Sequence, residues 1–505
     1  MAKLILAHDL GTSGNKATLF SSDGQLIRSS QYTYPTHYFH NNWAEQDADD
    51  WWKAVCACSK EVLTGFDPQD VAVVSFSGQM MACVCVDEKG TPLRKAIIWA
   101  DQRAETEANH IRAQISEEDF YHITGHKISP SYSLEKLMWV KNHEPEIYQR
   151  TYRMLQAKDY IIYKLTGNFV TDYSDASGSH LFDLSTLQWS DQIIGISGID
   201  REKLPELYPS TTVAGEVTAV AAKASGLAVG TPVVCGGGDG LCASVGAGCV
   251  KEGIAYNYIG SSSWIAIATP RPVYDLQMRT FTFAHIVPGM YSPTGTMQAA
   301  GASYQWLRNE LAGLETLEAE KQAVSTYEVM NQLVQTSPVG AKGLLYLPYL
   351  LGERSPRWNP NARGAFIGLK MEHTRADLFR AVLEGITLNL NIILDVFKEH
   401  VGIDEMILIG GGAKGEVWRQ MMADIYQLPV VKPNLLEEAT AMGAAITGGV
   451  GIGLFDRFDV IDQFLEMESR QFPITENVKA YERVKPIFEQ AYQQLVGVFD
   501  SLSEL

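Results

Sequence analysis

The chain has 505 residues, of which 46% are hydrophobic and 20% are charged, and both fractions are those of an ordinary globular protein. Its length indicates two or more domains, because single hydrophobic cores stop growing at roughly 250–300 residues. The formal net charge of −18 argues against non-specific binding to nucleic acid or to an anionic membrane. It does not argue against a nucleotide, because local dipoles and a metal ion set the potential at such a site.

Two further features of the composition favour a cytoplasmic location. No stretch approaches the ~18 apolar residues of a membrane-spanning helix, and the first apolar run, residues 4–7, is too short for a secretory signal. The seven cysteines lack the spacing of a disulfide framework, and Cys83 and Cys85 alternate along a predicted strand. We therefore expect packing cysteines in a reducing compartment.

Strand and helix patterns alternate along the chain, which favours an α/β architecture. The apolar runs predict strands over residues 4–8, 17–20, 71–76, 82–86, 96–99, 233–235, 255–259, 263–268, 406–409 and 429–432. The helical periodicities predict helices over residues 48–63, 103–114, 133–142, 158–165, 301–310, 377–397 and 417–427. Because a tight hairpin joins the first two strands, we expect mixed rather than purely parallel sheets.

The turn between the first two predicted strands is the most informative segment. Gly11, Thr12 and Ser13 offer backbone N–H groups and two hydroxyls, which suit phosphate oxygens, and Lys16 follows them. Asp9 precedes the turn and is placed to hold Mg²⁺ directly or through water. A carboxylate beside a phosphate cradle predicts a nucleoside triphosphate site.

A weak internal repeat of this turn occurs half a chain length later. Gly260, Ser261 and Ser262 follow one predicted strand and precede the next, as in the first turn. Two such turns facing each other would grip a polyphosphate from both sides, although Gly-Ser-Ser is also common turn chemistry. We therefore predict two domains, residues 1–250 and 251–505, joined by a tight hinge.

A second carboxylate of interest is Asp239, which follows a predicted strand and three glycines. An Asp at a helix start is most often an N-cap. A cap does not need three glycines, however, and a glycine run lets the backbone approach a ligand closely. The alternative role is a general base that takes the proton from a substrate hydroxyl as its oxygen attacks a phosphorus, worth roughly 10²–10⁴ in rate.

A third glycine-rich turn joins a predicted strand to a predicted helix. Gly410, Gly412 and Gly415 satisfy the G-x-G-x-x-G pattern of dinucleotide-binding turns. A dinucleotide-dependent oxidoreductase would also need an acidic residue about 20 positions on, where only Glu437 and Glu438 are loosely placed. The same turn can instead let a nucleoside lie against the backbone.

Polar and aromatic residues follow two strands of the N-terminal half. Trp99 offers an apolar face to the C–H groups of a sugar, and Gln79, Asp101 and Arg103 offer hydrogen bonds to its hydroxyls. The alternative is that Trp99 belongs to the core and that Asp101 and Arg103 form a surface pair. A cluster of side chains suited to binding a sugar argues against a non-catalytic, actin-like ATP binder, which would not need such a cluster.

The chain resembles the FGGY family of carbohydrate kinases through nearly its whole length. Residues 131–143 fit one family pattern, residues 364–369 with 377–384 fit a second, and residues 347–356 are typical of the family. The resemblance implies two ribonuclease-H-like (actin/hexokinase-type) domains with an interdomain cleft. It also implies Mg²⁺- and ATP-dependent phosphorylation of a sugar hydroxyl, and homodimers occur in the family.

The resemblance also implies roles for individual residues. Asp9 falls at the family's metal-associated carboxylate, and Asp239 falls at its catalytic base. The predicted nucleotide-binding residues are Gly11, Thr12, Ser13, Gly260, Ser261, Ser262, Gly301, Gln305, Gly411, Gly412 and Ala413. The predicted substrate-side residues are Gln79, Met80, Met81, Trp99, Asp101 and Asp239.

Within the family, residues 43–47, the Gln79-Met80 pair and residues 418–424 look most like those of xylulokinases, which implies D-xylulose and ATP as substrates. Two positions depart from that pattern. Met81 stands where a histidine is usual, and Gly240 stands where an asparagine is usual. Each departure removes a hydrogen-bonding group beside the sugar, commonly worth ~1 kcal/mol or more. Gluconate, glycerol or another ketose therefore remains an alternative substrate.

Overall fold

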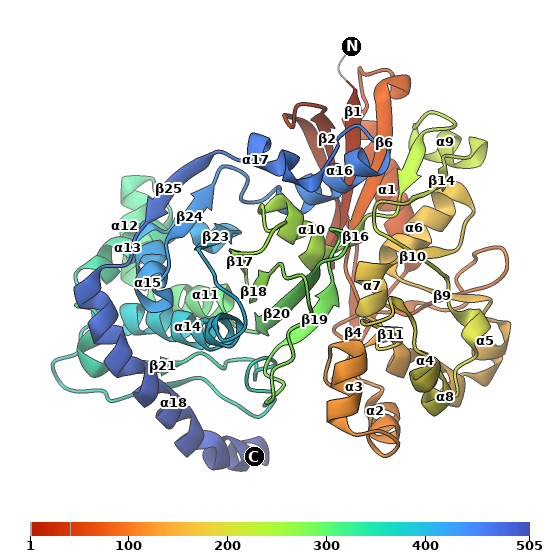
Figure 1. The fold of residues 1–505 in the computed structure, drawn as a ribbon. Helices are drawn as coiled ribbons and strands as arrows, with labels where there is room; N and C mark the ends of the chain where they lie inside the picture. Colours follow the sequence, from red (N-terminus) through yellow and green to blue (C-terminus); the bar gives the residue numbers. More distant parts are fainter. Residues whose placement is uncertain (1–2, 41) are drawn as a thin grey trace.

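A computed structural model describes residues 3–40 and 42–505, which form two lobes, each built on a seven-stranded sheet (Figure 1). The first sheet contains β1 (Leu4–Leu10), β2 (Gly14–Ser21), β3 (Leu26–Thr33), β6 (Val71–Gly78), β14 (Val213–Glu216), β15 (Pro232–Val234) and β16 (Gly237–Gly238). The second contains β17 (Ile254–Ile259), β18 (Ser263–Ile267), β19 (Phe281–Ala284), β20 (Tyr291–Met297), β23 (Glu405–Ile409), β24 (Val430–Pro433) and β25 (Met467–Gln471).

The two sheets share one topology. In the first, β1–β2 and β2–β3 are antiparallel, whereas β1–β6 and β6–β15 are parallel. In the second, β17–β18 and β18–β20 are antiparallel, whereas β17–β23 and β23–β24 are parallel. The turn at residues 11–13 and the turn at residues 260–262 therefore occupy equivalent places. The weak internal repeat in the sequence reflects a repeated fold, and the prediction of mixed sheets is confirmed.

The principal helices are α1 (Ala48–Val62), α2 (Glu105–Arg112), α4 (Ser133–His143), α6 (Ala157–Thr166), α7 (Tyr173–Ser177), α10 (Asp239–Gly246), α11 (Gly301–Leu311), α12 (Gly313–Gln322), α13 (Thr326–Gln335), α14 (Arg375–Lys398), α15 (Glu416–Tyr426), α16 (Ala439–Gly451) and α18 (Thr475–Ser503). Of these, α1 packs on β2 and β3, and α14 packs on β18 and β20. Two predicted strands are shorter than expected, namely β7 (Val84–Val86) and β8 (Ala96–Ile97). Within the described residues, no helix is both long and apolar enough to cross a membrane.

The helices α10 and α16 pack against each other where the lobes meet. A Cβ on Gly443 would lie 1.9 Å from the carbonyl oxygen of Cys242, and a Cβ on Gly246 would lie 1.7 Å from that of Ala439. Glycine is therefore required on both helices for this close approach. The helix α16 also packs on β1 and β6, although it follows the second lobe's strands in the chain.

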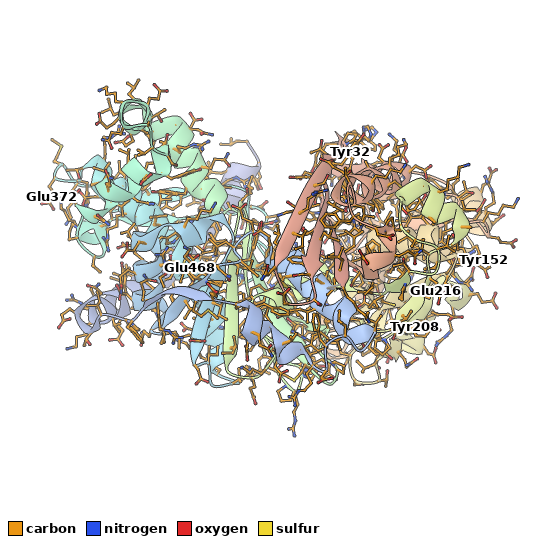
Figure 2. All side chains as sticks on the ribbon, turned by 90° about the horizontal axis from the view of Figure 1, so that it is seen from above. Tyr32, Tyr152, Tyr208, Glu216, Glu372 and Glu468 are labelled. Atoms are coloured by element: carbon orange, nitrogen blue, oxygen red, sulfur yellow. The ribbon has the colours of Figure 1, made fainter. Side chains whose placement is uncertain are left out.

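Seen from above, the two lobes lie side by side (Figure 2). Tyr32, Tyr152, Tyr208 and Glu216 mark the first lobe, and Glu372 and Glu468 mark the second. The strands of the first sheet all precede residue 250, and those of the second all follow it. Because α16 comes from the C-terminal half and packs on the first sheet, residues from both halves of the chain form the interface between the lobes.

Candidate active site

A cavity of about 540 Å³ lies between the lobes, and both hydroxyl-bearing turns open onto it. Its lining includes Thr12 and Ser13 from the first turn, Ser261 and Ser262 from the second, and Asp239. The fold thus brings together three groups that the sequence analysis took from separate segments. Phosphate oxygens placed here would meet hydroxyl groups from both lobes.

The first turn is held by its carbonyl groups. Tyr34 donates its hydroxyl to the carbonyl of Gly11, and the Gln46 side-chain amide donates to the carbonyl of Thr12. The Gly11 N–H donates to Gly14 at 3.0 Å, whereas the N–H groups of Thr12 and Ser13 donate to no group in the described part of the chain. These two N–H groups are therefore left for a ligand, and phosphate oxygens suit them.

The second turn is supported from below by the start of α11. The N–H of Gly301 donates to the carbonyl of Gly260 at 3.0 Å, and the N–H of Ala302 donates to that of Ser261 at 2.9 Å. A Cβ at residue 301 would lie 2.2 Å from the Gly260 oxygen, so only glycine fits. Gly301 thus supports the phosphate turn with its backbone, while Gln305 is exposed one helical turn further on.

Asp9 and Asp239 lie near enough for their charges to interact, but of the two only Asp239 lines the cavity. Asp9 accepts a hydrogen bond from the Ser77 hydroxyl at 2.9 Å, and Asp239 accepts one from its neighbour Gly240 N–H at 2.7 Å. Burial raises the pKa of Asp239 to about 7, and the nearby charge of Asp9 adds to the rise. Burial also raises the pKa of Asp9, although Ser77 and Lys16 oppose the rise.

The Asp9 carboxylate fits a magnesium ion, because it supplies oxygen, which Mg²⁺ prefers, and because a cation beside it would offset its repulsion with Asp239. No cluster of three metal-binding side chains occurs within the described residues. Nucleotide phosphates and water would therefore supply the remaining ligands, as is usual for Mg²⁺ bound with a nucleotide.

Asp239 is the first residue of α10 rather than its cap. Gly238 is the N-cap, and it makes no side-chain capping bond. The glycines that precede Asp239 have a structural reason that the sequence did not show, because they pack closely against protein. Gly236 has φ +67°, and a Cβ there would lie 1.9 Å from the carbonyl oxygen of Phe76. A Cβ on Gly238 would lie 2.5 Å from the sulfur of Met80.

Besides Asp239, three predicted substrate-side residues line the cavity, namely Met80, Met81 and Trp99. The Trp99 indole N–H donates to the Thr12 hydroxyl at 2.8 Å, which places this ring beside the first turn. Met81 has φ +62°, a left-handed conformation that is unfavourable for its side chain. The buried ammonium group of Lys136 donates to the Met81 carbonyl at 2.7 Å and holds that conformation.

Asp101 does not belong to this wall, contrary to the sequence prediction. Its carboxylate accepts hydrogen bonds from the Ala44 N–H at 2.6 Å and from Arg103 at 2.7–3.0 Å. Both side chains of this ion pair are fully buried, so the alternative of a surface pair is also wrong. Arg103 in turn pairs with Glu45 and stacks on Trp43, so Asp101 organises the protein beneath the cavity.

Gln79 is likewise absent from the cavity lining. It is buried, and its amide donates to the side-chain oxygen of Gln46 at 2.8 Å. Because Gln46 holds the Thr12 carbonyl, Gln79 acts on the first turn through a neighbour. Its geometry makes it a support for the phosphate turn rather than a group that touches a sugar.

The glycine-rich turn that follows β23 lies beside the second phosphate turn. A Cβ on Gly410 or Gly412 would collide with Ile259, which directly precedes that turn, whereas one on Gly411 would meet open space. Ala413 is fully buried, and its carbonyl accepts a hydrogen bond from Arg419 at 2.7 Å. Gly411 is thus the exposed part of the predicted nucleotide turn, and Gly412 is half-buried.

Several cavity residues escaped the sequence analysis. Arg354 lines the cavity together with Phe281 and Phe283. Its guanidinium makes no ion pair within 4.0 Å among the described residues. Tyr256 and Tyr258 also line the cavity, and alternation along β17 puts them on one face. The family-typical segment 347–356 was the only sequence signal for Arg354.

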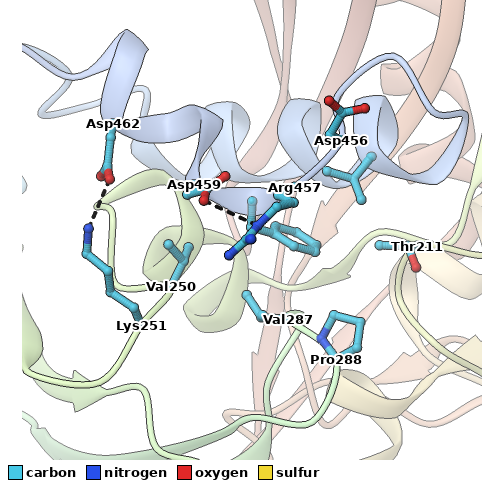
Figure 3. A pocket seen from close by; sticks show the side chains of 11 residues that line it. Thr211, Val250, Lys251, Val287, Pro288, Asp456, Arg457, Asp459 and Asp462 are labelled. Carbon is cyan, nitrogen blue, oxygen red and sulfur yellow. Dashed lines mark hydrogen bonds and ion pairs between the residues drawn. The ribbon is translucent and has the colours of Figure 1, made fainter.

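A second cavity, of about 380 Å³, contains none of the predicted site residues (Figure 3). Its wall includes Val250, Val287 and Pro288. Figure 3 shows two ion pairs at its edge, Lys251 with Asp462 and Arg457 with Asp459. Both basic side chains are thus already paired with carboxylates, which leaves this cavity without a clear anion-binding group.

Comparison with known proteins agrees with this geometry. Residues 4–246 match the N-terminal domain of the FGGY family of carbohydrate kinases, and residues 255–452 match its C-terminal domain. A gluconokinase of Bacillus licheniformis is 32% identical over 100% of this chain and 99% of its own. A xylulose kinase of Staphylococcus xylosus is 32% identical over 97% of this chain and 99% of its own.

Comparison of the fold with solved structures also finds carbohydrate kinases. The crystal structure of gluconate kinase from Lactobacillus acidophilus has a TM-score of 0.93 and 26% identity, and the match covers 99% of this chain and 100% of that one. Together with these matches, the two similar lobes with hydroxyl-bearing turns at a shared cavity are those of a carbohydrate kinase. The chain belongs to the FGGY family. The predicted fold class and enzyme class are confirmed, and the oxidoreductase and non-catalytic alternatives are wrong.

Proposed function

We propose that the protein transfers the terminal phosphoryl group of ATP to the terminal hydroxyl of D-xylulose, giving D-xylulose 5-phosphate and ADP. The observation that carries the proposal is the single cavity shared by both turns and Asp239. The Met80, Met81 and Trp99 wall beside Asp239 supports a small, flexible sugar. Relatives named xylulose kinase, similar along the whole chain, support the same substrate.

In this proposal Asp239 takes the proton of the sugar hydroxyl while the sugar oxygen forms a bond to the terminal phosphorus. The bond between that phosphorus and the bridging oxygen breaks, and ADP leaves. The free N–H and hydroxyl groups of the two turns hold the phosphate oxygens in place. Asp9 would hold Mg²⁺, which supplies positive charge against the phosphates. Closing of the lobes would exclude water, which otherwise competes with the sugar for the phosphoryl group.

For the nucleoside we propose a place against Gly411 and Gly412, with Gln305 at the same side of the second turn. Gly301 and Ala413 support this region through their backbones. The protein would work in the cytoplasm, where ATP is available. All seven cysteines are free thiols, which agrees with a reducing compartment.

Gluconate is the second candidate substrate, and Arg354 favours it. A guanidinium that pairs with no carboxylate among the described residues, set beside Phe281 and Phe283, suits a substrate that brings its own negative charge. A bidentate pair with a carboxylate would satisfy it. Gly240, which replaces a hydrogen-bonding residue next to Asp239, fits the same substrate, and one of the similar relatives is a gluconokinase.

A coupled assay of ADP release over D-xylulose, gluconate, glycerol and other ketoses would test the proposal. Arg354→Leu should lower kcat/KM at least 10-fold for gluconate and far less for D-xylulose if the arginine binds a carboxylate. Asp239→Ala should abolish phosphorylation of the sugar while ATP binding remains. Equal loss of both would contradict the assignment of the base. Asp456→Asn at the second cavity serves as a control that should keep full activity.

A further inference from the structure

A fully buried cluster of charged side chains lies behind Asp239. The ammonium group of Lys158 lies 2.7 Å from a carboxylate oxygen of Asp159, 2.7 Å from one of Asp172 and 3.2 Å from one of Asp175. All four side chains are at most 1% exposed. A buried ionic cluster is costly to desolvate and is weak evidence for stability alone, so its position in the fold matters.

The cluster reaches the backbone beside Asp239 through one hydroxyl. The second carboxylate oxygen of Asp172 accepts hydrogen bonds from the N–H of Ser174 at 2.9 Å and from its hydroxyl at 2.5 Å. The Ser174 hydroxyl oxygen, in turn, accepts a hydrogen bond from the N–H of Gly238 at 3.0 Å. A continuous chain therefore runs from Lys158 to the residue directly before the proposed base.

Two further contacts restrain the backbone at Gly238. It pairs with Gly78 through β16 and β6. A Cβ on the preceding residue, Gly237, would lie 2.8 Å from the Ser174 oxygen. The serine thus fills the space behind this backbone and also satisfies its N–H. Without the hydroxyl, the Gly238 N–H would be a buried donor without a partner, which the backbone can relieve only by moving.

We infer that Ser174 and Asp172 are positioning residues that fix the direction in which Asp239 meets the sugar hydroxyl. This inference rests on the proposed role of Asp239 as the base. A base must lie within hydrogen-bond reach of the proton that it takes. A displacement of about 1 Å can cost roughly 10²-fold in rate. The link from Asp172 through Ser174 to Gly238 is the connection that would prevent such a displacement.

Ser174→Ala should lower kcat 10- to 100-fold and leave the KM for ATP within about threefold, because the phosphate turns are untouched. Ser174→Thr restores the hydroxyl and should recover most of the rate. Asp172→Asn keeps the side-chain volume and should lower kcat in the same way from the other end of the chain. Thermal midpoints of all variants would show that each one folds.

Ser210→Ala is the matched control. The Ser210 hydroxyl also donates to Asp172, at 2.6 Å, and is equally buried, but its oxygen does not accept from Gly238. This variant should keep kcat within about threefold. A folded Ser174→Ala enzyme with near-normal kcat would overturn the inference, as would a Ser210→Ala enzyme as slow as Ser174→Ala. Asp239→Ala is measured alongside to test the role of the base separately. If this variant retains activity, Asp239 is not the base, whereas an inactive Asp239→Ala with a normal Ser174→Ala overturns only the positioning inference.

Discussion

Asp239→Asn should inactivate the enzyme and at the same time stabilise its fold above pH 7. The environment that prepares this carboxylate as a base also disfavours its charge, since burial raises its pKa from 3.8 to about 7. Below pH 3.8 the group is protonated in the folded and unfolded states, so it costs nothing. The cost grows as pH rises from about 4 to 7 and is complete above 7.

The size of this effect follows from the shift. About three pKa units at 1.36 kcal/mol each set an upper limit of about 4 kcal/mol. The side chain is only half-buried, and solvent screening reduces the figure to ~1–2 kcal/mol. Because asparagine is neutral at every pH, the variant should gain that amount over the parent enzyme at pH 8.5 and about 40% of it at pH 5.

Urea unfolding of both proteins at pH 5 and pH 8.5 would measure the difference. Asp456→Asn, an exposed residue at the second cavity, is the control for simple loss of a negative charge from an acidic protein. A gain of the same size at both pH values would refute the reasoning, as would an Asp239→Asn protein that is less stable at pH 8.5.

Three further predictions concern activity. The kcat/KM for the sugar should fall about tenfold per unit below an apparent pKa near 7, because Asp239 must be deprotonated to accept a proton; a flat pH–rate profile between 5 and 7 would contradict this. Lys136→Met should free the strained Met81 backbone and raise the sugar KM about 10-fold with the ATP KM unchanged, as steady-state kinetics would show. Gly301→Ala should displace the second phosphate turn and weaken ATP binding at least 10-fold by calorimetry, whereas Gly313→Ala, where a Cβ has open space, should not.

The parts of the fold around the site that the sequence predicted correctly are those encoded locally. A strand, a Gly/hydroxyl turn and a second strand are readable from neighbours in the chain, and the two copies at residues 11–13 and 260–262 reinforce each other. The family patterns then supplied the fold. The shared cavity followed because the two sheets repeat one topology, so that equivalent turns open between the lobes.

The misplaced residues depend on partners far away in the chain. Asp101 satisfies its carboxylate with Ala44 and its neighbour Arg103, and Gln79 gives its amide to Gln46. Sequence spacing cannot reveal that such acceptors and donors are already used. Arg354 shows the reverse case, since only the folded chain reveals that no carboxylate among the described residues pairs with its guanidinium.

The elements that were missed have weak local signals. The helix α16 contains several glycines, which lower helix propensity, and it exists because close packing on α10 and the first sheet requires them. The helix α18 contains Pro486, a residue that normally ends a helix. The strand β3 is a largely exposed edge strand with a polar sequence, so it lacks the apolar alternation of its neighbours.

The central claim is that both turns and Asp239 serve one phosphoryl transfer. A crystal structure with Mg²⁺, a non-hydrolysable ATP analogue and the sugar that the ADP-release screen selects would test it directly. The account predicts the two outer phosphates between Thr12–Ser13 and Ser261–Ser262, with a sugar hydroxyl in hydrogen-bond contact with the Asp239 carboxylate. Phosphates bound outside the cavity, or a sugar hydroxyl remote from Asp239, would contradict it.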